Sequence, residues 1–135
     1  MSKAEFRYLS QEDILALNIP YIDVIHAVEK VMSEFAKGSC QLPVKIHVNT
    51  RPQTYINAMP AYVGGSDEAT GLKWVAGYPG NRAKGLPVTW GLMVMNDCET
   101  GAVQAEMDAR WITAIRTAAV AAVTAKHCRV QDTHS

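Results

Sequence analysis

The sequence has no excess of either charge, because its 13 Lys and Arg residues are balanced by 13 Asp and Glu residues. A balanced chain creates no long-range field that would draw it to nucleic acid or to an acidic membrane surface. Strand content alone would favour a small nucleic-acid-binding barrel, and the neutral charge argues against that class. We therefore expect neither a nucleic-acid partner nor a membrane partner.

Cysteine is scarce, and its spacing is typical of neither a metal site nor a disulfide framework. Cys40, Cys98 and Cys128 are an odd number, lie far apart and form no CxxC pair. The N-terminal stretch MSKAEFRYLSQED carries acids where a signal peptide would be apolar, and no run approaches the roughly 18 apolar residues of a membrane helix. We predict a soluble, cytoplasmic chain without a metal.

The motifs that bind nucleotides or build common hydrolase sites are also missing. The sequence contains no GxGxxG after a strand, no GxxxxGKS/T, no HExxH and no GxSxG. We therefore expect these residues to bind no nucleotide unaided. The 135 residues, 48% of them hydrophobic, are nevertheless enough for one domain with a core.

What is present is a hydrophobic period that changes from helical to alternating and back to helical. Helices are predicted from a cap at Ser10, over about 20–37, and from a cap at Asp108 to His127. Strands are predicted over 6–9, 43–48, 55–63, 72–77, 88–95 and 102–107, with turn residues between them. This order predicts an α+β fold with a mixed or antiparallel sheet packed with helices.

Arg116 lies on an otherwise apolar stripe of the last predicted helix, which includes Ile112 and Ala119. Its guanidinium is predicted to point into the protein, where a charge is costly unless it is paired. The planar guanidinium suits a small carboxylate ligand. An intramolecular pair with Glu106 or Asp97 is the alternative.

Two strand lysines extend this hypothesis. Lys73 lies between Leu72 and Trp74, where a shielded lysine would act as an acid, a base or a carboxylate anchor, although a solvent-facing lysine is the commoner case. Lys45 is predicted to lie mid-strand, opposite an apolar face. If the two strands share a sheet face, Lys45, Lys73 and Arg116 converge on one anion.

Two strand residues have both a functional and a structural interpretation. Asn57 and Met59 are candidates for lining the same pocket, with core packing as the alternative. Pro60 beside them indicates an edge, a bulge or an interruption of strand pairing. His26 has no second ligand at metal spacing, so a structural or surface histidine is predicted.

Five stretches follow one another in a specific order. They are LPVKIHV at 42–48, AMPAYV at 58–63, GLKWVAGYPGN at 71–81, GLPVTWGLMVMNDCETG at 85–101 and MDARWITAIRTAA at 107–119. In this combination the chain resembles the N-terminal part of the ornithine cyclodeaminase/mu-crystallin family, over about residues 5–127.

The resemblance implies a substrate-binding and dimerisation domain whose sheet pairs with that of a second subunit into a closed barrel. Complete members join this domain to a Rossmann domain that carries NAD or NADP. They act as dehydrogenases, ketimine reductases or cyclodeaminases on small amino and imino acids, and hydride passes between the substrate Cα and the nicotinamide. A homodimer is therefore expected.

The resemblance also assigns roles to residues of this chain. It implies that Lys45, Lys73 and Arg116, with Met59 beside them, bind the substrate and its carboxylate. Lys73 would in addition be catalytic, by assisting proton transfer to water at the imine carbon. Lys45 stands where ornithine cyclodeaminases proper tend to have an arginine, which argues against ornithine as the substrate.

Thr117 and Val88 are the positions that the resemblance implies for contact with the cofactor. The family continues from the last helix into the cofactor domain, whereas this sequence ends about eight residues after that helix. We expect residues 1–127 to form the substrate-binding and dimerisation domain, with the Rossmann domain absent. We expect residues 128–135 to form an irregular tail produced by truncation or a frameshift.

Such a truncated member would supply the carboxylate site of an NAD(P)-dependent ornithine cyclodeaminase-like enzyme or amino-acid dehydrogenase. The isolated chain would be inactive, because it lacks the cofactor domain. A non-catalytic small-molecule binding or dimerisation domain is the alternative.

Overall fold

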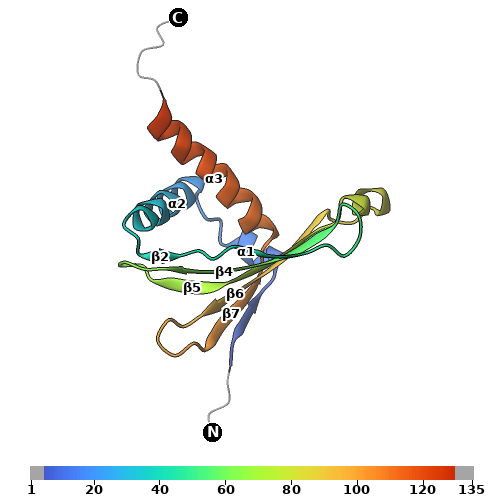
Figure 1. Cartoon of the computed structure of the whole chain (residues 1–135), viewed down its shortest axis with the longest axis horizontal. Coiled ribbons are helices and arrows are strands. Elements are labelled where there is room, and N and C mark those ends of the chain that lie inside the picture. The colour runs from blue at the N-terminus through green and yellow to red at the C-terminus, as the bar shows by residue number, and fades with distance from the viewer. Residues whose placement is uncertain (1–4, 130–135) are drawn as a thin grey trace, which may run out of the picture.

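In the computed structural model, which describes residues 5–129, two long helices lie over one face of a seven-stranded sheet (Figure 1). The predicted tail therefore lies outside the described residues from residue 130 onward. The elements in chain order are β1 (Arg7–Leu9), α1 (Gln11–Ala16), α2 (Tyr21–Ala36), β2 (Cys40–Gln41), β3 (Ile46–Val48), β4 (Tyr55–Val63), β5 (Ala69–Gly77), the 3-10 helix η1 (Pro79–Lys84), β6 (Thr89–Asn96), β7 (Val103–Asp108) and α3 (Arg110–Cys128).

The sheet is mixed, as the sequence predicts. Its strand order is β1-β7-β6-β5-β4-β2, with β3 also paired to β4. The short β1 runs parallel to β7, and the other pairs are antiparallel. The register across the three central strands places Met59 opposite Lys73 and Lys73 opposite Met93.

The first helix begins where the sequence places its cap. The Ser10 hydroxyl accepts a hydrogen bond from the backbone N–H of Asp13 at 3.1 Å, and the Asp13 carboxylate accepts one from the backbone N–H of Ser10 at 2.8 Å. This reciprocal capping box satisfies two N–H groups that the first turn leaves without helical partners. The prediction of a helix that starts at Ser10 is therefore confirmed.

The start of α3 differs from the prediction. Its N-cap is Ala109, which contributes no side-chain hydrogen bond, and Asp108 is the last residue of β7. The carboxylate of Asp108 still accepts hydrogen bonds from the backbone N–H and the Nε of Arg110, at 2.8 and 2.9 Å. Asp108 thus serves the helix terminus from one residue farther out, because the sheet ladder extends to it.

The predicted strand over 43–48 is wrong in its first half. Only Ile46–Val48 forms β3, whereas the preceding residues leave the sheet after β2. β2 pairs with Val63 and Tyr62 of β4, and β3 pairs with residues 58 to 56, so residues 59–61 have no partner on that side. Pro60 lies in this gap, where its missing N–H costs no ladder bond. The predicted interruption of strand pairing at Pro60 is confirmed.

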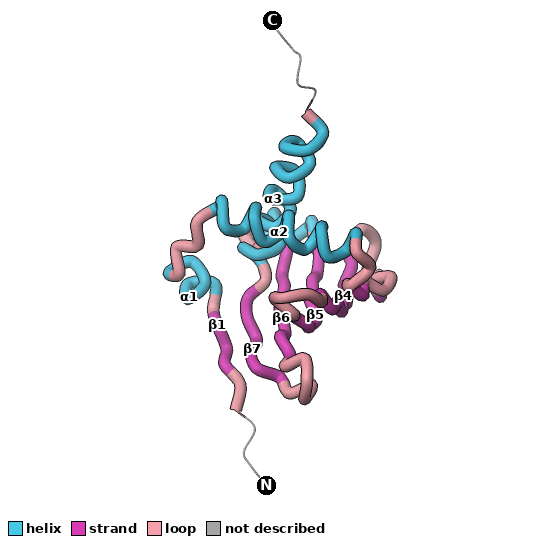
Figure 2. Tube along the Cα trace, turned by 90° about the vertical axis from the view of Figure 1, so that its left-hand side faces the viewer, coloured by secondary structure: helices cyan, strands magenta, loops and turns pink. Residues whose placement is uncertain are grey.

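The two faces of the sheet differ in how they are covered (Figure 2). α2 and α3 cover the face that carries Lys73. The opposite face carries a row of apolar residues across neighbouring strands, in which Ile46 pairs with Ala58, Ala58 with Trp74, and Trp74 with Leu92. Ile46 and Trp74 are 65% and 47% exposed. This face of the sheet therefore lacks a cover within the described residues.

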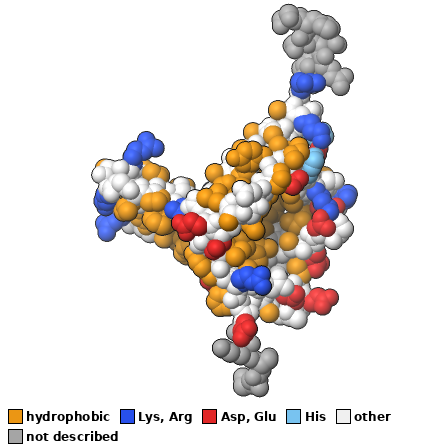
Figure 3. Space-filling model, turned by 180° about the vertical axis from the view of Figure 1, so that it is seen from behind, with side chains coloured by type: hydrophobic (Ala, Val, Ile, Leu, Met, Phe, Trp, Pro, Cys, Tyr) orange, Lys and Arg blue, Asp and Glu red, His pale blue; other side chains and the backbone are white. Residues whose placement is uncertain are grey.

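The core is small for a domain of this length. Among the described residues the buried hydrophobic side chains are Ile14, Val75, Ala109, Ala119 and Val123. α2 has no buried residue, and its apolar side chains Tyr21 and Phe35 are exposed. Hydrophobic side chains accordingly cover much of the face seen in Figure 3. Such a surface is typical of a chain that packs against further protein.

Candidate functional site

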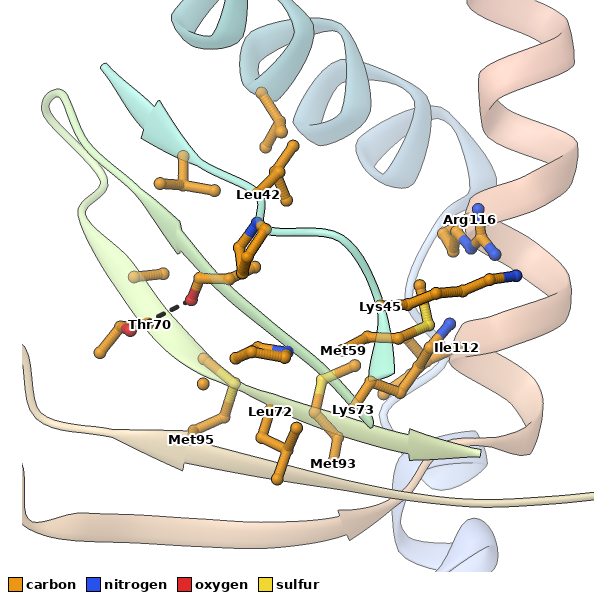
Figure 4. A pocket seen from close by; sticks show the side chains of 17 residues that line it. Leu42, Lys45, Met59, Thr70, Leu72, Lys73, Met93, Met95, Ile112 and Arg116 are labelled. Carbon is orange, nitrogen blue, oxygen red and sulfur yellow. Dashed lines mark hydrogen bonds between the residues drawn. The ribbon is translucent and has the colours of Figure 1, made fainter. Parts of the chain in front are cut away.

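A cavity of about 640 Å³ lies between the helix-covered face of the sheet and the two long helices (Figure 4). The loop between β2 and β3 forms part of its wall, because the interrupted pairing at Pro60 moves this loop away from β4. The lining residues are Val31, Leu42, Pro43, Lys45, Met59, Pro60, Ala61, Val63, Ala69, Thr70, Gly71, Leu72, Lys73, Met93, Met95, Ile112 and Arg116. Most of this wall is apolar, so the few charged groups on it are functionally informative.

Lys73 enters the cavity from the middle of β5. It lies between Met59 and Met93 in the register of the sheet, and its side chain is partly buried. Burial, and secondly the positive charge of Arg116, hold the pKa of Lys73 below its ordinary value of 10.5. Both effects disfavour the ammonium form, so a bound anion would be stabilised here and would raise this pKa.

Arg116 lines the cavity from α3, one helical turn after Ile112. The prediction that its side chain is enclosed by protein is wrong, since Arg116 is exposed. The apolar stripe does face the sheet, but the described residues place no element over the outer side of α3 at this point. The guanidinium therefore lies at the mouth of the cavity.

The alternative prediction, an ion pair between Arg116 and Glu106 or Asp97, is not found among the described residues. None of their ion pairs includes Arg116. Asp97 instead accepts hydrogen bonds from Thr100 and Gln104 in the turn between β6 and β7. Within residues 5–129 the positive charge of Arg116 therefore has no ionic partner.

Lys45 completes the group of cations. It precedes β3 rather than lying mid-strand, and it is exposed. The structure nevertheless brings it to the same cavity as Lys73 and Arg116, and the three side chains lie at one end of that cavity (Figure 4). No carboxylate of the described residues lines the cavity. Three cations from separate segments can together hold a small anion, and the arginine can do so through two parallel hydrogen bonds.

The structure separates the two strand candidates Asn57 and Met59. Met59 lines the cavity, whereas Asn57 is buried and its Oδ1 lies 2.6 Å from Nδ1 of His47. Nε2 of His47 lies 2.9 Å from Oδ1 of Asn49. The structure therefore supports the packing interpretation of Asn57. His26 is exposed on α2, which agrees with a surface histidine.

Several residues that line the cavity are not predicted from the sequence. Met93 lies opposite Lys73 in the sheet, and Met95, Leu42 and Thr70 also line the wall. Pairing the alternation of strand 72–77 with that of strand 88–95 in the correct register would find Met93. The sequence offers no comparable signal for Leu42, since its position depends on the loop that leaves the sheet.

The two residues implied for cofactor contact lie outside the cavity lining. Thr117 is exposed, and its hydroxyl donates a hydrogen bond to the carbonyl of Thr113 at 2.8 Å. Val88 is partly buried just before β6, and its carbonyl accepts a hydrogen bond from the N–H of Tyr78 at 2.8 Å. Thr117 follows Arg116 in the sequence, and both residues are exposed on α3.

The fold and the cavity define a small α+β domain with three cationic side chains at one end of a largely apolar cavity. The model of the ornithine cyclodeaminase/mu-crystallin family matches residues 7–135, and the chain belongs to this family. It is 40% identical over 124 residues to the nodulation efficiency protein NfeD of Rhizobium meliloti, a match that covers 92% of this chain and 38% of that protein. The chain therefore spans well under half the length of this relative.

Solved structures agree with the family assignment. An archaeal alanine dehydrogenase dimer with bound NAD matches with a TM-score of 0.83 and 38% identity, over 90% of this chain and 37% of that one. The Δ1-pyrroline-2-carboxylate reductase of Thermococcus litoralis, in complex with NADH and L-proline, matches with a TM-score of 0.85 and 34% identity, over 90% of this chain and 38% of that one. These similarities confirm the α+β fold predicted from the sequence.

Proposed function

We propose that this chain supplies the carboxylate-binding part of an NAD(P)-dependent oxidoreductase or cyclodeaminase that acts on a small amino or imino acid. The observation that carries the proposal is the convergence of Lys45, Lys73 and Arg116 on one cavity whose described lining contains no acid. An anionic ligand would neutralise this cluster. A carboxylate matches the planar guanidinium of Arg116 and the point charges of the lysines.

In this proposal Arg116 and Lys45 hold the carboxylate, and Met59 packs against the substrate. Lys73 has a pKa below its ordinary value because of burial and Arg116, so it exchanges a proton more readily at neutral pH than an exposed lysine does. In this role Lys73 assists carboxylate binding, or its neutral amine accepts a proton from the water that attacks the imine carbon. Two solved relatives support this substrate class. One is an alanine dehydrogenase with bound NAD, and the other is a reductase in complex with NADH and L-proline.

The cofactor would be NAD or NADP, which supplies hydride transfer when bound. None of the described elements forms a parallel βαβ unit, so we infer that this domain supplies only part of the cofactor site. The exposed Thr117 and the partly buried Val88 are proposed as the edge of this domain that meets the cofactor. Further protein would provide the remainder of that site.

We extend the proposal to a homodimer, because one sheet face is apolar and uncovered in this chain. Ile46 and Trp74 lie in one row on that face, and a second copy placed against it would remove both from water. The solved archaeal relative is a dimer.

Within residues 5–129 none of the helices has the length and apolarity needed to span a membrane. The three unpaired cysteines suit a reducing cytoplasm.

The proposal is tested by thermal denaturation of the chain with L-alanine, L-proline and pyruvate. Stabilisation by at least one of these acids is expected, and it should be lost in Arg116→Ala. Arg82→Ala is the matched control, because Arg82 is an exposed arginine on η1 that does not line the cavity. Equal stabilisation of the two variants would contradict the proposed carboxylate site.

A further inference from the structure

The cavity is polar at one end and apolar at the other. Lys45, Lys73 and Arg116 lie together near α3, whereas Leu42, Met95 and Thr70 lie toward the other end (Figure 4). Met59 and Met93 flank Lys73 across the sheet. A ligand whose acid group meets the cations must therefore extend its other end along a wall of thioether and aliphatic groups.

We propose that this cavity selects an amino or imino acid with an unbranched or thioether apolar side chain and rejects one whose side chain ends in an ammonium. This inference rests on the proposed function, since it assumes that the carboxylate binds to the three cations. Methionine side chains are flexible and polarisable, so Met59, Met93 and Met95 adapt to an extended aliphatic chain. The cavity of about 640 Å³ has room for such a chain beyond the carboxylate.

An ammonium at the far end would find no free carboxylate, because Glu34 and Asp67, which line the neighbouring pocket beyond Val31 and Val63, already pair with Lys37 and Lys30. The described lining contains no carboxylate, and the hydroxyl of Thr70 donates its hydrogen bond to the carbonyl of Ala61 at 3.1 Å. A charge moved from water to an apolar wall without a counter-ion loses solvation that nothing replaces. The three cations at the other end add repulsion.

The test compares two pairs of amino acids that differ only by a terminal ammonium. L-norleucine is compared with L-lysine, and L-norvaline with L-ornithine, by calorimetric titration of the chain. The apolar member of each pair should bind at least about tenfold more tightly, a ratio typical of an unpaired charge in an apolar site. Equal or tighter binding of lysine and ornithine overturns the inference.

A charge placed at the far end should reverse the preference. Met95→Glu is expected to bind lysine more tightly than norleucine, while Met95→Gln, which is similar in size and uncharged, should keep the preference for norleucine. Leu42→Glu offers a second position on the loop if Met95→Glu disturbs the sheet. No reversal in either acidic variant would contradict the assignment of this end to the side chain.

The outcomes separate this inference from the proposed function. If lysine matches norleucine and both lose affinity in Arg116→Ala, only the side-chain selectivity is wrong. If none of the four amino acids binds and the acids of the thermal test also fail, the carboxylate site itself is wrong. Tighter binding of norleucine that persists in Arg116→Ala also overturns the inference, because the carboxylate then lies elsewhere.

Discussion

Lys73 on β5 and Arg116 on α3 line the same cavity although they are far apart in the sequence, and the charge of Arg116 adds to burial in lowering the pKa of Lys73. Two cations that repel each other across a cavity store an unfavourable interaction in the free protein. A carboxylate bound between them would relieve it. The relationship between these two residues therefore connects the stability of the domain to the occupancy of its site.

The first prediction concerns the pH dependence of stability. The pKa of Lys73 is lowered in the folded chain, so the unfolded chain binds more protons between the folded and unfolded pKa values. The free energy of unfolding should therefore rise as the pH increases through this window toward about 10.5. Denaturant titrations of the wild type and Lys73→Met across pH 7–11 measure the difference.

Lys73→Met removes the titrating group, so its stability should lack this rise. The variant should also be somewhat more stable than the wild type at neutral pH, where the penalty on the ammonium is largest. Parallel curves for the two proteins would contradict the lowered pKa.

The second prediction separates the charge of Arg116 from its shape. Arg116→Lys keeps the charge but loses the paired hydrogen bonds, so affinity for a carboxylate ligand should fall about tenfold. Arg116→Ala should lower it about a hundredfold. Titration calorimetry with the tightest of L-alanine, L-proline and pyruvate measures both losses, and equal affinities of the two variants would argue against a paired contact.

The third prediction concerns the capping box. Ser10→Ala removes the hydroxyl that accepts from the N–H of Asp13, and it should lower the free energy of unfolding by about 1 kcal/mol. Ser33→Ala, at an exposed position of α2, should have little effect.

Acid should weaken the same cap. The hydrogen bonds from the hydroxyl and the backbone of Ser10 hold the pKa of Asp13 below its ordinary value. The stabilising effect of the charged carboxylate is therefore present above the unfolded pKa and is lost as the pH falls through the folded pKa. A cost of Ser10→Ala that stays constant into strong acid would exclude this coupling.

The fourth prediction tests the uncovered sheet face. Trp74→Glu places a charge in the row that contains Ile46 and Leu92, and it should weaken a homodimer at least about tenfold. Tyr21→Glu changes an exposed aromatic residue on α2 and should leave the dimer intact. Analytical ultracentrifugation distinguishes the two, and dimers of equal strength in both variants would place the interface elsewhere.

Local signals in the sequence predict a large part of the fold. The capping box at Ser10 is a short-range pattern, and the boundaries of β4 follow from the turn residues on both sides of it. Lys73 is correctly expected in a strand, whereas the alternation with Leu72 and Trp74 leaves open whether its side chain faces a pocket or solvent. The order of five motifs predicts the family, which the comparison confirms.

The remaining errors arise where long-range contacts decide the structure. The alternation of Val44, Ile46 and Val48 suggests one continuous strand, but Pro60 on the neighbouring strand interrupts the pairing that residues 43–45 would need. Arg116 is expected to be enclosed because its helix stripe is apolar. Its exposure depends on which elements cover α3, and local periodicity does not encode that.

The proposed carboxylate site is tested most directly by an NMR titration of Lys73, with its side chain labelled, in the presence of propionate or propionamide. The two compounds have nearly the same shape, and only propionate carries a charge. Propionate should raise the pKa of Lys73 toward its ordinary value, while propionamide should leave it unchanged. Saturating propionate that fails to move the pKa of Lys73 would contradict the claim that a carboxylate binds between Lys73 and Arg116.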